Sequence, residues 1–311
     1  MSLEILKLWL KETIKNSENE TPNENKSYWD GWRDSRTSVI KKINRLQKLK
    51  LKNYIGITGC PTESDLIEIL SLFGKYNISI DYSTHHIPML GFLVDNKTIK
   101  EKFNPKKAYP DLDELTKMLV KAKGNVFSTI HYNSKNNEFD ELIYFLDDFG
   151  YSKIIDGIQF NFLYPDPKKL LILKEKFPFL KFIFQLHKGY FEKYGGGYDI
   201  IRYIKKTYYM MDYILFDSSR GKGVEITSPQ LKDYAQIGYA FNEEFKIGIA
   251  GGLKAHNLNE NLDEMSKHFG TLDFSFDAQS CFWNKNGEFD LSKVDCYLKK
   301  YNSFLNRWKT E

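Results

Sequence analysis

The sequence has few cysteines, and none of them has the spacing of a disulfide framework or a zinc ribbon. Its 311 residues include three, Cys60, Cys281 and Cys296, with no CxxC motif. Long apolar runs are also absent, so no segment is long enough to cross a bilayer, and residues 1–10 lack the basic start and apolar stretch of a signal peptide. These absences predict a cytoplasmic protein in a reducing compartment, with no membrane partner.

Neither sign of charge is in large excess. The chain has 45 basic and 41 acidic residues, a net charge of +4, which leaves no broad basic surface for nucleic acid. The densest basic run, between residues 41 and 52, has the spacing of a solvated helix face. Apolar residues make up 41% of the chain, enough for a sizeable core. We therefore expect a globular protein whose partner is a small molecule and not nucleic acid.

From Asn53 onward, short β-rich runs alternate with helical periods, as in repeated βα units with a parallel sheet. The pattern predicts an α/β protein with a (β/α)8 TIM barrel over residues 53–311. An open doubly wound sheet is the rival fold, but Gly56-x-x-Gly59 lacks the GxGxxG spacing. The expected strands are Tyr54–Thr58, Ile78–Tyr82, Val126–His131, Gly157–Phe162, Phe182–Leu186, Tyr213–Asp217, Lys246–Ala250 and Leu272–Asp277.

Residues 1–52 precede this pattern and contain two amphipathic stretches separated by a polar connector. We expect an N-terminal helical extension that closes the bottom of the barrel or forms a contact in a homo-oligomer, and both readings stay open. The helices expected within the barrel include Ser64–Phe73, Glu138–Phe149 and a closing helix over Val294–Trp308.

Active sites of such barrels lie at the carboxyl ends of the strands, and here those ends are polar. Histidines that titrate near neutrality stand among aspartates, as acid-base chemistry requires. The glycine pair after strand seven lets backbone approach a ligand, for example a phosphate. The candidate residues are His86 after strand two, His131 after strand three, Gln159 and Asn161 in strand four, His187 after strand five, Asp217 and Arg220 after strand six, Gly251 and Gly252 after strand seven, and Asp277 and Ser280 after strand eight.

Several segments resemble phosphoribosylanthranilate isomerase. They are Leu215-Phe216-Asp217, Gly221-Lys222-Gly223, Ile249 to Leu253, Phe276 to Ser280 and Asn286 to Asp290, with Gly157-Ile158-Gln159 and Gly56-Ile57-Thr58 earlier in the chain. The resemblance implies a ribulose-phosphate-binding barrel in which Asp217 is the general acid and Gly251 and Gly252 form half of a phosphate site. In the other half, Gln279-Ser280-Cys281 replaces the family's Ser-Ser-Gly turn.

The family's general base is a cysteine at the end of strand one, and this chain lacks it. Alignment places Ile55 or Ile57 at that position, and Cys60 lies beyond the strand. We therefore expect a divergent member, an isomerase or lyase of a small phosphorylated metabolite, with His131, His86 or Cys60 removing a proton and no cofactor. The stretch Ile87–Pro110 is expected to be a functional insertion, such as a lid.

Three alternatives stay open. Asp81, His86 and His131 on neighbouring strands suggest a metal-dependent enzyme with His and Asp ligands. The missing cysteine favours a catalytically inactive barrel that binds a ligand. Lys188 after strand five would serve a Schiff-base aldolase if it were buried and desolvated.

Overall fold

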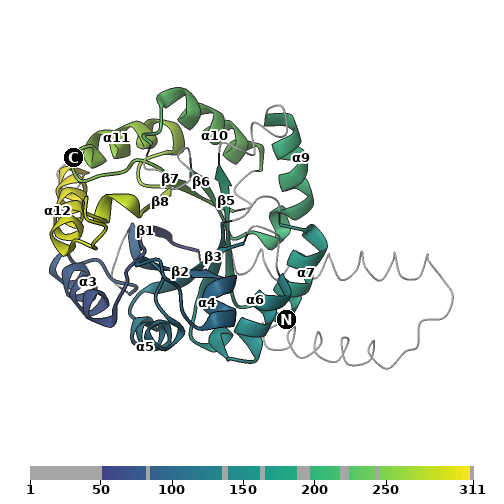
Figure 1. The fold of residues 1–311 in the computed structure, drawn as a ribbon. Helices are drawn as coiled ribbons and strands as arrows, with labels where there is room; N and C mark the ends of the chain where they lie inside the picture. Colours follow the sequence, from purple (N-terminus) through teal and green to yellow (C-terminus); the bar gives the residue numbers. More distant parts are fainter. Residues whose placement is uncertain are drawn as a thin grey trace, which may run out of the picture. The chain divides into compact units, whose positions relative to one another are not determined.

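The computed structural model describes residues 51–81, 85–134, 139–161, 165–187, 197–217, 224–241 and 245–308. Eight parallel strands close into a barrel in chain order, and the last strand pairs with the first (Figure 1). The strands are β1 (Asn53–Thr58), β2 (His86–Asp95), β3 (Phe127–Asn133), β4 (Gly157–Phe160), β5 (Lys181–His187), β6 (Tyr213–Asp217), β7 (Lys246–Ala250) and β8 (Ser275–Ala278). The structure thus confirms the predicted TIM barrel.

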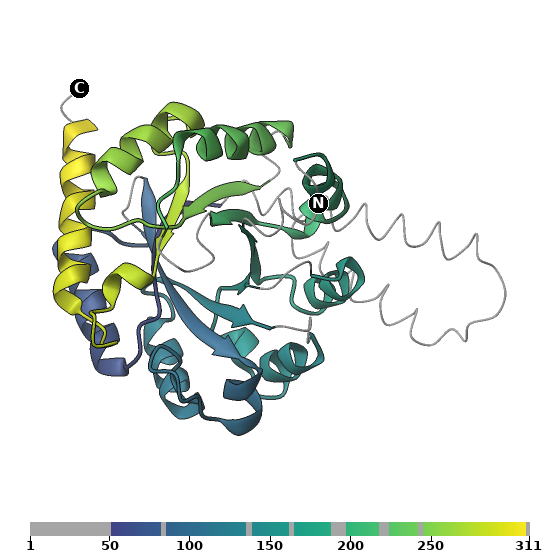
Figure 2. The ribbon, with the colours of Figure 1, turned by 45° about the horizontal axis from the view of Figure 1, so that its top comes forward.

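Helices surround the strands and connect each one to the next (Figure 2). The last helix, α12, lies beside α3, the helix that follows β1. The ring of helices therefore closes where the barrel closes. The longer helices are α3 (Glu63–Lys75), α4 (Asn96–Glu101), α5 (Leu112–Ala122), α6 (Phe139–Asp147), α7 (Pro167–Lys176), α9 (Gly197–Thr207), α10 (Ser228–Ala240), α11 (Leu258–Phe269) and α12 (Leu291–Trp308). Short 3-10 turns are η1 (Tyr151–Lys153), η2 (Tyr208–Met210) and η3 (Ser280–Phe282).

Polar residues fix where these helices begin. Thr62, Asp111 and Asp166 precede α3, α5 and α7, and each accepts a hydrogen bond from a backbone N–H of the first turn. Such caps satisfy donors that have no partner within the helix. They fix the loops that connect the strands to these helices.

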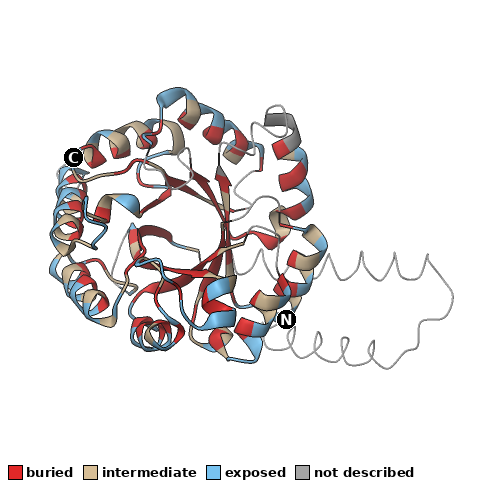
Figure 3. Ribbon diagram, viewed as in Figure 1, coloured by how far each residue is buried: buried red, intermediate tan, exposed pale blue. Residues whose placement is uncertain are grey.

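The core has two layers, which Figure 3 shows as red strands and red inner helix faces. The larger layer fills the space between strands and helices, and Ile55 and Ile57 of β1 belong to it. The smaller layer fills the barrel itself and consists of Tyr54, Met89, Phe127, Ile183, Tyr213, Leu215 and Ala250. Because successive side chains of a strand point to opposite faces, Gly56 and Thr58 face the barrel interior with Tyr54.

The predicted position of strand two was wrong. Residues 78–81 form a turn region after α3, and the strand is His86–Asp95. Pro88 and Gly91 lie within that strand. Both residue types are disfavoured inside strands, so the sequence does not indicate a strand there. His86 therefore begins the strand instead of following it, as its register with Asn53 at the start of β1 shows.

The expected insertion Ile87–Pro110 consists of most of β2, the helix α4 and a connecting loop. Only the end of this loop reaches the mouth of the barrel, through Tyr109.

Strand eight was also predicted too early, because Leu272 has a φ of 59°, outside the extended region. The helical extension expected over residues 1–52 lies outside the described residues, except for residues 51 and 52. In the described part of the chain, no helix has the length and apolarity to cross a membrane.

Candidate active site

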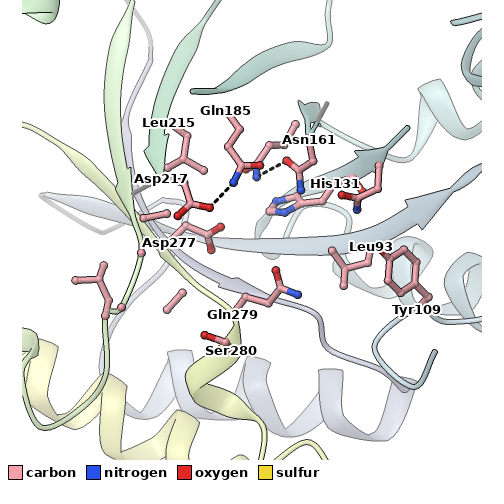
Figure 4. A pocket seen from close by; sticks show the side chains of 17 residues that line it. Leu93, Tyr109, His131, Asn161, Gln185, Leu215, Asp217, Asp277, Gln279 and Ser280 are labelled. Carbon is pink, nitrogen blue, oxygen red and sulfur yellow. Dashed lines mark hydrogen bonds between the residues drawn. The ribbon is translucent and has the colours of Figure 1, made fainter. Parts of the chain in front are cut away.

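A cavity of about 370 Å³ opens at the carboxyl ends of the strands (Figure 4). It is polar, and most of its side chains come from the inward-facing ends of β3 to β8. Its lining consists of Leu93, Tyr109, His131, Asn133, Gln159, Asn161, Gln185, Leu215, Asp217, Ala250, Gly251, Gly252, Leu253, Asp277, Ala278, Gln279 and Ser280. The structure thus brings eight of the sequence-predicted residues together: His131, Gln159, Asn161, Asp217, Gly251, Gly252, Asp277 and Ser280.

Two buried carboxyl groups face each other across one strand. Asp217 ends β6 and pairs in register with Ala250 of β7, which pairs in turn with Asp277 of β8. Their Cα atoms are two strand spacings apart, roughly 10 Å. The small Ala250 between them leaves the cavity open, and both aspartates point into it in Figure 4.

The two carboxyl groups have different surroundings. Thr58 Oγ1 donates a hydrogen bond to Asp277, at 2.9 Å from Oδ1 and 3.1 Å from Oδ2. Burial, which is the largest cause, and the negative charge of Asp217 together raise the pKa of Asp277 to about 7, against the opposing effect of the hydrogen bond from Thr58. Gln185 Nε2 donates to Asp217 Oδ2 at 2.6 Å and holds that carboxylate in place. Asp277 therefore carries a transferable proton near neutral pH.

His131 is a poor general base in this setting. Its side chain is 1% exposed, and burial lowers the pKa of its imidazole to about 3. A base with so low a pKa has little driving force for removing a proton from carbon. The ring is neutral at physiological pH and acts instead as a hydrogen-bonding group.

The glycine pair after β7 forms a bend with φ values of 110° for Gly251 and 65° for Gly252. A Cβ atom at position 252 would lie 2.5 Å from the Cα of Glu225, so close packing against that loop requires glycine here. Asn257 fixes the bend, since its Nδ2 donates to the backbone oxygen of Gly252 at 3.1 Å and to Glu225 Oε1 at 2.9 Å. The bend, Ser280 and Asp277 all line the cavity.

The structure does not place Cys60 or His86 at the mouth. Cys60 is buried in the layer between strands and helices, where burial raises the pKa of its thiol strongly. His86 lies at the opposite end of the barrel: its Nδ1 is 2.8 Å from the hydroxyl of Tyr301 and its Nε2 is 2.7 Å from the backbone oxygen of Phe274. Neither side chain lines the cavity, so the structure separates both predicted residues from Asp217 and Asp277.

The same geometry rules out the metal site suggested by Asp81, His86 and His131. Asp81 is exposed in the turn before β2, whereas His131 lies near the far end of β3. Among the described residues, no three His, Cys, Asp or Glu side chains are grouped closely enough to hold a metal ion. Arg220, Lys188 and the side chain of His187 lie outside the described residues, so their predicted roles stay predictions.

Several residues of the site were not predicted from the sequence, and Gln185, Thr58 and Tyr109 are three of them. Gln185 is the only polar residue in the run Phe182–Leu186, and its alternation with the neighbouring apolar residues could have placed it inside the barrel. Thr58 ends β1. The alternation of side chains along the strand could have placed it inside the barrel, at the carboxyl end. Tyr109 lies on the loop between α4 and α5, and no pattern in the sequence marks it.

No protein-family model and no curated protein matches the chain in sequence. Solved structures do match in fold. Phosphoribosyl anthranilate isomerase from Thermus thermophilus is 14% identical with a TM-score of 0.55, and the match covers 80% of this chain and 98% of that one. A second phosphoribosyl anthranilate isomerase, in complex with reduced 1-(o-carboxyphenylamino)-1-deoxyribulose 5-phosphate, is 14% identical with a TM-score of 0.52, over 81% and 99% of the chains.

Tryptophan synthase subunit alpha from Legionella pneumophila is 11% identical with a TM-score of 0.52, and the match covers 86% of this chain and 98% of that one. The likeness is one of fold. It confirms that the barrel resembles phosphoribosylanthranilate isomerase and other barrels of that architecture, as the strand-end segments suggested. At this identity, function has to be argued from the cavity itself.

Proposed function

We propose that this chain is an isomerase or lyase that acts on a small, phosphorylated, sugar-like metabolite by general acid-base catalysis. The observation that carries the proposal is the pair of buried carboxyl groups in one cavity, with the pKa of Asp277 raised to about 7 beside the charged Asp217. Two acids whose surroundings differ in this way are suited to opposite roles in proton transfer.

In this proposal, Asp217 accepts a proton from a carbon next to a carbonyl or imine group. The electron pair of that C–H bond forms a carbon–carbon double bond, the π pair of the C=O or C=N group moves to oxygen or nitrogen, and Asp277 gives its proton to that atom. Asp217 then returns a proton to the former carbonyl or imine carbon while the hydroxyl on the neighbouring carbon gives its proton to Asp277 and becomes a carbonyl, which completes an isomerisation. The resemblance assigns the acid role to Asp217, whereas the raised pKa of Asp277 favours the reverse assignment at the first step.

The base position of the related family does not carry over. Both residues aligned with its cysteine, Ile55 and Ile57, pack against the surrounding helices and not into the barrel. On this account Asp277, hydrogen-bonded to Thr58 at the end of β1, completes the acid-base pair in place of that cysteine.

A phosphate group is expected at the bend of Gly251 and Gly252 and at Ser280. Positive φ at both glycines makes the backbone accessible, and backbone N–H groups bind phosphate in many barrels of this kind. One structural neighbour binds a ribulose 5-phosphate derivative, which supports the proposal. Arg220, which follows β6 in the sequence, is the cation we expect to assist.

The test follows proton exchange in deuterated water by ¹H NMR. The probes are ribose, arabinose and xylose 5-phosphates and their arylamine adducts, each paired with its unphosphorylated form. We expect loss of the proton signal next to the anomeric carbon, or conversion of the probe, for at least one phosphorylated probe and a weaker effect without phosphate. If the folded protein binds such probes without exchange or cleavage, the inactive ligand-binding barrel replaces this proposal.

A further inference from the structure

Two buried side chains at the mouth each keep one polar atom without a hydrogen-bond partner in the described part of the chain. These atoms are Nε2 of His131 and Oε1 of Gln159. The residues are only 1% and 2% exposed, and they are register partners on β3 and β4. Both line the cavity that holds Asp217 and Asp277, and Figure 4 shows the ring of His131 facing it. Buried polar atoms of this kind are costly unless something binds them.

The orientation of each group is defined by its neighbours. Gln159 Nε2 donates to Asn161 Oδ1 at 2.9 Å, so the unpartnered end of the amide is the acceptor. His131 is neutral because burial lowers the pKa of its ring to about 3, so one ring nitrogen donates and the other accepts. Gly91 makes room for the ring, since a Cβ atom there would lie 2.3 Å from His131 Nε2.

Only some ligand groups satisfy both atoms. An alcohol hydroxyl donates to Gln159 Oε1 and accepts from the N–H of a ring protonated on Nε2. Ionised phosphate and carboxylate oxygens only accept, so Gln159 Oε1 would repel them, whereas an ammonium group only donates. The chemistry therefore favours an uncharged hydroxyl at this point of the cavity.

We propose that His131 and Gln159 form a hydroxyl clamp, which binds one free hydroxyl group of the substrate next to the carbon that reacts. The clamp narrows the substrate class to phosphorylated sugars or polyols with a hydroxyl at that carbon, and it deprives His131 of the role of general base. The placement beside the reacting carbon rests on the proposed function of Asp217 and Asp277. The clamp itself rests on the two unpartnered atoms.

The test measures binding of ribitol 5-phosphate and its 1-, 2-, 3- and 4-deoxy forms by isothermal titration calorimetry. We expect the natural protein to bind one deoxy form at least about tenfold more weakly than the parent polyol, because that form leaves the clamp unpaired. Gln159→Met and His131→Leu are expected to lose the discrimination at that carbon and to keep any discrimination elsewhere. The exposed Gln236→Met on α10 is the matched control and should bind all probes as the natural protein does.

A merely structural role predicts a different pattern. If Gln159 only held the barrel together, Gln159→Met would lower the melting temperature and leave the discrimination unchanged. The clamp predicts the loss of discrimination whatever the change in melting temperature, because Gln159→Met removes the hydrogen bond to Asn161 as well as the unpaired acceptor. His131→Leu provides a second variant if Gln159→Met does not fold.

The outcomes separate the clamp from the proposed catalysis. Proton exchange without discrimination between the deoxy forms contradicts the clamp alone. Discrimination that depends on Gln159, without proton exchange on any sugar phosphate, contradicts the catalytic proposal and leaves the clamp as a binding site. Failure of all five probes to bind contradicts the clamp, whatever the exchange experiment shows.

Discussion

At the scale of single residues, the site combines groups whose neighbours set their protonation in opposite directions. Burial lowers the pKa of His131 to about 3 and raises the pKa of Asp277 to about 7, and Gln185 donates a hydrogen bond to Asp217. The sequence showed which polar residues end the strands. It did not show these protonation states, because they depend on burial and on neighbours such as Thr58 that are distant in the chain.

The first prediction concerns the stability cost of Asp277. Its pKa is raised from 3.8 to about 7 in the folded protein, so the folded state binds the proton more tightly than the unfolded state, and stability falls as pH rises from about 4 to about 7. Asp277→Asn removes this pH-dependent loss of folding stability, which is on the order of a few kcal/mol. We expect the variant to melt about 5 °C higher than the natural protein at pH 8, with the difference vanishing near pH 4.

Thermal unfolding followed by circular dichroism from pH 4 to pH 8 checks this expectation. Asp148→Asn changes an exposed carboxylate on the protein surface and serves as the control with no pH-dependent difference. A variant that is less stable than the natural protein at pH 8 would show that the ionised Asp277 stabilises the fold, contrary to this account.

At the scale of elements, β2 shows what could and could not be predicted from the sequence. Seven of the eight strands overlap their predicted positions, although β8 begins three residues later than predicted. β2 was missed because it carries Pro88 and Gly91. Gly91 has a packing role that no local pattern reveals: its missing side chain accommodates both His131 and Thr58.

The second prediction follows from that packing. A Cβ atom at position 91 would lie 2.3 Å from His131 Nε2 and 2.5 Å from Thr58 Oγ1, so Gly91→Ala must displace both groups. We expect lower stability, by about 1–3 kcal/mol, and weaker binding of ribitol 5-phosphate. Gly74→Ala, within α3 and with open space around it, should instead raise the melting temperature slightly through helix propensity. Equal effects of the two changes in denaturant unfolding would refute the packing argument.

At the scale of the whole molecule, the ionisable groups Lys174, Asp212 and His86, buried at the amino-terminal end of the barrel, are all hydrogen-bonded. At the amino-terminal end, Lys174 Nζ lies 2.7 Å from Asp212 Oδ2 and donates to the backbone oxygen of Leu180. His86 at that end is bonded on both ring nitrogens. At the carboxyl end, His131 and Gln159 keep unpartnered atoms. Asn53 Oδ1, at the amino-terminal end, is also unpartnered in the described part of the chain, so the contrast holds for these ionisable groups and not for every polar atom.

The third prediction concerns His86, which connects β2 to the closing helix α12 through Tyr301. Burial lowers the pKa of His86 from 6.5 to about 4, so the folded protein holds the ring neutral, and its contribution to stability is lost as pH falls from about 6.5 to 4. His86→Asn should lower stability by about 1–3 kcal/mol at pH 7 and flatten the dependence on pH within that window.

Urea unfolding at pH 7, 6, 5 and 4 tests this, with the exposed His256→Asn as the control. An unchanged pH dependence in His86→Asn would mean that His86 is not held neutral in the folded barrel.

The central claim is that Asp217 and Asp277 form the acid-base pair. The most direct measurement is the rate of deuterium exchange into a phosphorylated pentose as a function of pH, for the natural protein and for Asp217→Asn, Asp277→Asn and the control Asp148→Asn. The account predicts a rate that falls as pH rises through about 7, the pKa of Asp277, and a loss of about 10²–10⁴-fold in each site variant but not in the control. Exchange that persists at the natural rate in either site variant would contradict it.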